Sequence, residues 1–108
     1  WKTNSRATFQ GGQQKLLEIA RVTMLNPELF LLDEPFYGIH PTLKNKILDF
    51  VVSFNRKNKT FVIVSHDIPS IMKVGKEIMV MSSGKLLARG NPEEVRNNQD
   101  VIETYLGV

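Results

Sequence analysis

The sequence contains no cysteine, which excludes disulfide bonds and thiolate metal sites and is compatible with a reducing compartment. Its apolar runs are far shorter than the ~20 residues that a membrane-spanning helix needs. No charged leader followed by an apolar stretch opens the chain. The first residue is Trp1 instead of Met, which suggests processing or an excerpt of a longer protein. No repeat, low-complexity segment or Gly/Ser linker divides the chain, so we treat residues 1–108 as part of one domain.

The composition is that of a globular protein. Of the 108 residues, 42% are hydrophobic and 23% are charged, which supports a packed core and excludes a disordered chain. Fourteen basic residues against eleven acidic ones give a net charge of +3. The basic residues are scattered, so this mild excess does not predict a nucleic-acid-binding surface.

The first two thirds of the chain alternate between helix and strand patterns. Apolar residues recur at helical spacing from Gly12 to about Met24, where Asn26-Pro27 ends the pattern. The apolar run 29–32 predicts a strand buried on both faces. Residues 43–54 predict a second helix, and the run 60–64 predicts a second buried strand. This alternation predicts an α/β fold with a largely parallel sheet and flanking helices.

The last third shows a hairpin and short helices. Residues 78–81 and 86–88 flank Ser82-Ser83-Gly84, as in a β-hairpin. Asn91-Pro92-Glu93-Glu94 combines a cap, an early proline and an acid three residues on, which predicts a helix start. A further helix begins near Asp100.

Both predicted buried strands end in residues that are suited to catalysis. Asp33 and Glu34 end the first strand, and His66 follows the second. Because ligands of open α/β sheets bind beyond the carboxyl ends of the strands, we expect these side chains to meet at one edge. Two acids there suit a hard cation and a water to be activated. From the residues alone, acids that cap a turn and a histidine that ends a strand remain an equal alternative.

A pair of glycines precedes the first predicted helix, in Phe9-Gln10-Gly11-Gly12-Gln13-Gln14. Backbone N–H groups at a helix N-terminus bind phosphate, and glycine lets the anion approach closely. Taken alone, however, such a pair is more typical of a flexible turn than of a binding site.

The order GGQQKLLEIAR, LFLLDEP, YGIHP and FVIVSHD resembles the ATP-binding subunits of ABC transporters over nearly the whole chain. The resemblance implies a partial P-loop NTPase (RecA-like) fold of the ABC ATPase type without its N-terminal P-loop half. Residues 1–108 would be the C-terminal part of the nucleotide-binding domain. The resemblance places four motifs: the ATP-contacting signature loop at Gln10, Gly11, Gly12 and Gln13, the end of the Walker B strand at Asp33 and Glu34, the D-loop at Gly38, His40 and Pro41, and the switch histidine at His66.

The same resemblance implies roles and partners. Asp33 would hold Mg²⁺, through water, Glu34 would orient or deprotonate the attacking water, and His66 would contact the γ-phosphate of ATP. Two ATPase subunits would form a head-to-tail dimer in which Gly11 and Gly12 close over the nucleotide of the other subunit. Transmembrane permease subunits would be further partners, at the cytoplasmic face of the membrane.

One part of the family pattern is absent, and two positions depart from it. A P-loop reads G-x-x-x-x-G-K-[ST], but neither Gly75-Lys76 nor Gly84-Lys85 has the required flanking residues. We therefore expect the isolated chain to be inactive. Phe9-Gln10 replace the usual Leu-Ser of the signature, and His40 replaces the usual Asp or Asn. We favour His40 as a neutral hydrogen-bonding substitute over a pH-sensing role.

The C-terminal third of the sequence indicates which subfamily the chain resembles. KEIMVMSSGKLLARGNPEEV followed by DVIETYLGV resembles the ATPase of branched-chain amino-acid importers, with the lipopolysaccharide-export ATPase as an alternative. DNA-repair and chromosome-organising ATPases share the signature loop but have a long coiled coil before it, and the lead-in here shows no heptads. A further alternative is that the chain is a truncated, non-hydrolytic interaction module.

Overall fold

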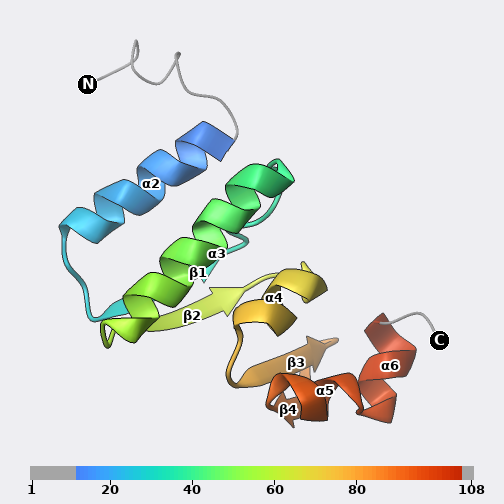
Figure 1. Ribbon diagram of the computed structural model, residues 1–108. Coiled ribbons are helices and arrows are strands. Elements are labelled where there is room, and N and C mark those ends of the chain that lie inside the picture. The colour runs from blue at the N-terminus through green and yellow to red at the C-terminus, as the bar shows by residue number, and fades with distance from the viewer. Residues whose placement is uncertain (1–11, 106–108) are drawn as a thin grey trace. The chain divides into compact units, whose positions relative to one another are not determined.

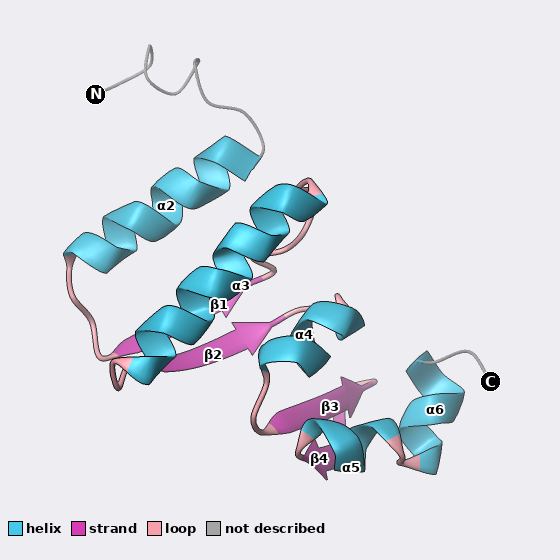
Figure 2. Cartoon of the chain, in the orientation of Figure 1, coloured by secondary structure: helices cyan, strands magenta, loops and turns pink. Residues whose placement is uncertain are grey.

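The computed structural model describes residues 12–105, which form two compact units that we describe separately (Figures 1 and 2). The first unit comprises the described residues up to Ile68, and the second begins at Pro69. No helix within residues 12–105 has both the length and the apolar character that crossing a bilayer requires.

The first unit is built on two parallel strands joined through a helix. Helix α2 (Gly12–Met24) precedes strand β1 (Leu29–Asp33), and helix α3 (Pro41–Arg56) leads to strand β2 (Thr60–Val64). The strands pair in parallel, from Leu29 opposite Thr60 to Asp33 opposite Val64. The predicted helix from Gly12 to Met24 and the neighbouring parallel strands are therefore confirmed.

Aromatic side chains fill the space between this sheet and α3. Phe30 of β1 is 1% exposed and stacks on Phe61 of β2, with ring centroids 4.7 Å apart. Phe50 and Phe54 of α3 meet Phe30 edge-on at 5.7 and 6.1 Å. Offset and edge-to-face pairs of this kind add to the hydrophobic burial. Helix α3 completes this core with Ile47, Leu48 and Val51, all of which are buried.

The opposite face of the sheet is exposed, contrary to the prediction that the first strand is buried on both faces and that the second is also buried. Leu31 is 71% exposed and Val64 60% exposed, and Leu29 and Val62 lie on the same face. Side chains alternate between the two faces of a strand, and within residues 12–68 helices cover only the face that carries Phe30. Each strand therefore carries more apolar side chains than the described part of this unit buries.

The second unit is a hairpin covered by short helices. Helix α4 (Ile68–Val74) leads into β3 (Ile78–Ser82), which pairs antiparallel with β4 (Lys85–Gly90). Ser83 and Gly84 have φ of 52° and 76°. Positive φ at both central residues marks a type I′ turn, which matches the strand twist. The predicted hairpin is confirmed, each strand being slightly longer than expected.

Two helices close this unit. Helix α5 (Pro92–Arg96) begins with a full capping box between Asn91 and Glu94, as predicted, and α6 (Gln99–Tyr105) follows. The core consists of apolar side chains from the hairpin and the helices, with Ile78, Val95 and Val101 buried at its centre.

Candidate functional site

The carboxyl ends of β1 and β2 meet at one edge, as the sequence predicted. Asp33 lies opposite Val64 in the register, and the Glu34 N–H donates to the Val64 carbonyl at 2.7 Å. The strand ladder therefore extends into Glu34. His66, two residues past Val64, lies beside the turn that begins at Glu34.

Glu34 and His66 are in direct contact. The His66 backbone N–H donates to Glu34 Oε1 at 3.1 Å, and His66 Nδ1 lies 3.0 Å from the same oxygen. Since an ionised carboxylate only accepts hydrogen bonds, this contact requires the proton on Nδ1. The Glu34 side chain is 35% exposed and that of His66 73%. Both groups are therefore accessible to a ligand or a water.

The backbone of Glu34 is fixed on both sides. Its φ is 52°, in the left-handed region. Besides the bond from its N–H, its carbonyl accepts from Tyr37 N–H at 3.3 Å and from Lys15 Nζ at 3.2 Å. Sequence reasoning missed Lys15, because a lysine within a helix pattern carries no sign of its tertiary acceptor.

Asp33 is the last residue of β1 and is exposed. The described part of the chain contains no group of three or more His, Asp or Glu side chains that could hold a metal ion. Mg²⁺, however, is commonly bound by one or two carboxylates together with waters and substrate phosphates. The donor set at Asp33 thus fits a magnesium ion that arrives with a nucleotide.

The residues predicted to form the D-loop shape the start of α3. Gly38 has a φ of 68°, and His40 is the N-cap, with its Nδ1 accepting from Thr42 N–H at 3.1 Å. Pro41 occupies the first helical turn. An accepting Nδ1 carries no proton, so this ring nitrogen of His40 caps the helix as the side-chain oxygen of Asp or Asn does.

An ion pair fixes the segment that carries His66. Lys44 Nζ, in the first turn of α3, lies 2.5 Å from Asp67 Oδ2, with both side chains partly buried. The Asp67 N–H donates to Ser65 Oγ at 3.0 Å. His66 is therefore held between two anchored neighbours.

Only part of the predicted signature loop can be located. Gln10 and Gly11 lie outside the described residues. Gly12 begins α2 and is buried, and a Cβ there would overlap Leu43 Cδ1 of α3. Gly12 therefore has a packing reason of its own, since it lets the two helices approach closely. Gln13 is exposed at the start of α2.

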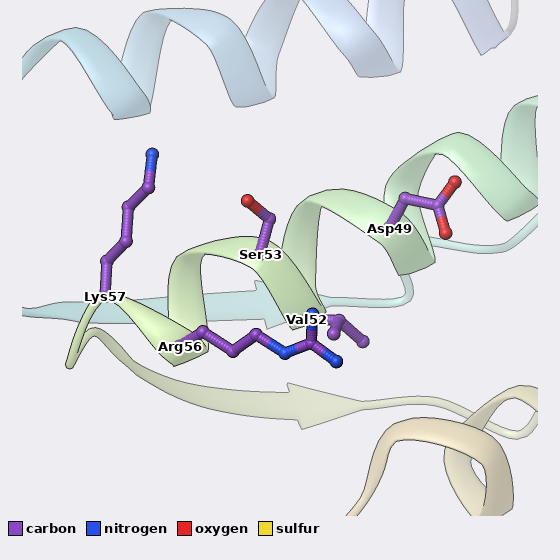
Figure 3. A pocket seen from close by; sticks show the side chains of 5 residues that line it. All are labelled: Asp49, Val52, Ser53, Arg56 and Lys57. Atoms are coloured by element: carbon purple, nitrogen blue, oxygen red, sulfur yellow. The ribbon is translucent and has the colours of Figure 1, made fainter.

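A surface hollow on α3 is a separate feature (Figure 3). It is lined by Asp49, Val52, Ser53, Arg56 and Lys57, all from the C-terminal part of this helix and its C-cap. This segment leads into the N-terminal end of β2, whereas Glu34 and His66 lie at the C-terminal ends of the strands. The hollow therefore does not belong to the candidate site.

Two family models match the sequence. Residues 2–37 match the ABC transporter family, and residues 85–108 match the branched-chain amino acid ATP-binding cassette transporter family. A probable branched-chain amino acid transport ATP-binding protein of Archaeoglobus fulgidus is 36% identical over 107 residues, which are 99% of this chain and 41% of the relative. The high-affinity branched-chain amino acid transport ATP-binding protein of Salmonella typhimurium is 40% identical over 97 residues, 89% of this chain and 38% of the relative.

Solved structures agree with the sequence matches. An ATP-binding cassette of an ABC transporter in its ADP conformation has a TM-score of 0.79 at 33% identity, over 93% of this chain and 41% of that one. A nucleotide-free ATP-binding cassette has a TM-score of 0.80 at 33% identity. The chain spans about two fifths of the length of these proteins. The resemblance to ABC-transporter ATP-binding subunits, and the partial α/β fold that it implies, are confirmed.

Proposed function

Starting from a chain whose sequence and fold match the ATP-binding subunits of ABC transporters, we propose that residues 1–108 supply the catalytic acid and the switch histidine of a transport ATPase. They would form the C-terminal part of its nucleotide-binding domain. The observation that carries the proposal is the contact of Glu34 Oε1 with His66 at the shared edge of two parallel strands. That edge is where open α/β sheets bind their ligands.

Glu34 is the general base of this proposal. Both contacts from His66 fall on Oε1, and within residues 12–105 no hydrogen bond occupies Oε2. That oxygen is available to accept from the attacking water and to orient it or take its proton. A positioned base of this kind contributes typically about 10²–10⁴-fold to the rate.

His66 senses the γ-phosphate in this scheme. Its Nδ1 proton is directed at Glu34, and a phosphate oxygen that arrived there would compete for the same donor. Binding of ATP would then release Glu34 from the imidazole as His66 turns to the phosphate. The large exposure of the His66 side chain leaves room for this rotation.

The remaining groups complete the nucleotide site. Bound Mg²⁺, with Asp33 as its carboxylate partner through water, would neutralise charge on the transferring phosphoryl group. The P-loop would come from sequence outside these 108 residues. Gln10, Gly11, Gly12 and Gln13 would face the nucleotide of a second subunit in a head-to-tail dimer.

We infer the class of transported substrate from the same relatives. Because residues 85–108 match the branched-chain amino acid family, we favour import of leucine, isoleucine or valine over lipopolysaccharide export. Transmembrane permease subunits and a position at the cytoplasmic face belong to this proposal. Disruption of the gene should abolish high-affinity leucine uptake by the host cell, and unchanged uptake would reject this substrate class.

The hydrolytic role is tested with Glu34→Gln in the intact protein that contains this chain. The amide keeps the shape of the side chain but cannot accept a proton, so steady-state ATP hydrolysis should fall by about two orders of magnitude or more. Glu28→Gln is the matched control, because Glu28 directly precedes the other end of β1 and is exposed. A Glu34→Gln rate within about twofold of the wild type would show that Glu34 is not the base.

A further inference from the structure

Glu34 has a backbone conformation that does not suit its residue type. Four non-glycine residues in the described part of the chain have positive φ. Asn26 and Asn58 belong to the type that tolerates this region best, and Ser83 lies in a type I′ turn that requires it. Glu34, at 52°, has neither reason. Such a conformation persists only where the surroundings impose it, and it often marks a functional position.

Three hydrogen bonds hold the backbone of Glu34 in this left-handed conformation. The bond from Glu34 N–H to Val64 continues the strand ladder, and the bond from Tyr37 N–H closes the local turn. Only the third, from Lys15 Nζ to the Glu34 carbonyl at 3.2 Å, comes from an element other than the two strands and the turn that follows β1. It reaches across 19 residues of sequence from α2.

Lys15 is in an unusual position for a lysine. Its ammonium is directed at a main-chain carbonyl in a partly buried contact, and none of the salt bridges within residues 12–105 includes it. A charged donor makes a stronger hydrogen bond to a carbonyl than a neutral one does. The contact thus ties α2, whose first residue belongs to the predicted signature loop, to the backbone of Glu34.

We infer that Lys15 is a positioning residue, which holds the Glu34 backbone in its left-handed conformation and thereby aims the carboxylate. This inference rests on the proposed function, because the aim of Glu34 affects the rate only if Glu34 acts in hydrolysis. Lys15 acts on the carbonyl of Glu34, so its loss should lower kcat and leave KM for MgATP almost unchanged.

The test uses the intact protein with Lys15→Met, Lys15→Arg and the control Lys46→Met. Methionine keeps the length of the chain but removes the donor, whereas arginine keeps a charged donor. Lys46 is an exposed lysine of α3. We expect Lys15→Met to lower kcat about tenfold with KM within twofold, Lys15→Arg to recover most of the rate, and Lys46→Met to match the wild type.

A double-mutant cycle separates positioning from a general structural effect. If Lys15 acts through Glu34, Lys15→Met should not lower the residual rate further in a Glu34→Gln background. An additive loss would overturn the inference. So would a loss of rate in both Lys15→Met and Lys15→Arg that accompanies a parallel fall in Tm. Failure of the proposed function is distinguishable, because Glu34→Gln alone would then leave the rate unchanged.

Discussion

At the scale of single residues, the contact between Glu34 and His66 links the proposed base to the proposed phosphate sensor. One carboxylate oxygen accepts two donors from the histidine residue, so a phosphate that drew the imidazole away would also change the contacts of the proposed base. Coupling of this kind suits an ATPase that must not hydrolyse its nucleotide before the γ-phosphate is in place.

The meeting of these residues was predictable from sequence, and the residues that support them were not. Asp33, Glu34 and His66 follow apolar strands, and parallel strands bring such ends together whatever the rest of the fold does. The hydrogen bond of Lys15 and the ion pair of Lys44 depend on how α2 and α3 pack on the sheet. No local pattern encodes that packing.

His40 provides a prediction at this scale. Its imidazole caps α3 by accepting from Thr42 N–H, so His40→Ala should lower the free energy of unfolding by about 1 kcal/mol. His40→Asn should retain most of the stability, since asparagine is among the best caps. Urea unfolding of the intact protein measures both. Equal stability of His40→Ala and the wild type would mean that the cap contributes nothing.

At the scale of elements, the local signals were reliable where residue type dictates backbone geometry. The helix from Gly12 to Met24, the Ser83-Gly84 turn and the Asn91 capping box all formed where the sequence placed them. The burial of β1 and β2 was predicted less well. An apolar run shows that a strand is suited to burial, but the layer that buries it has to be supplied by other elements.

The exposed sheet face leads to a prediction for the isolated chain. Leu29, Leu31, Val62 and Val64 form a contiguous apolar surface beside strand edges, and such surfaces favour association. The isolated 108 residues should therefore self-associate in sedimentation velocity experiments as their concentration rises.

Two substitutions identify this face as the cause. Leu31→Thr combined with Val64→Thr should shift the chain toward monomer, because threonine keeps the β-propensity but removes apolar surface. Val22→Thr, at an exposed apolar position of α2, is the control and should change little. A stable, compact wild-type monomer at high concentration would contradict the prediction.

At the scale of the whole molecule, the chain contains the proposed hydrolytic residues without the main source of nucleotide affinity. It spans about two fifths of its relatives, and its 108 residues include no P-loop motif. In P-loop proteins the loop backbone and its lysine cradle the phosphates. Here the glycines of the signature loop would offer one helix terminus, which contributes about 1–2 kcal/mol at most.

We propose that this chain is the catalytic part of an ATPase whose phosphate cradle lies elsewhere, and calorimetry with MgATP on the isolated 108 residues tests this most directly. A contribution of about 1–2 kcal/mol corresponds to binding weaker than millimolar. We therefore predict no saturable binding and no hydrolysis, with activity only when the chain is joined to a part that carries a P-loop. Micromolar affinity of the isolated chain for MgATP would contradict the account.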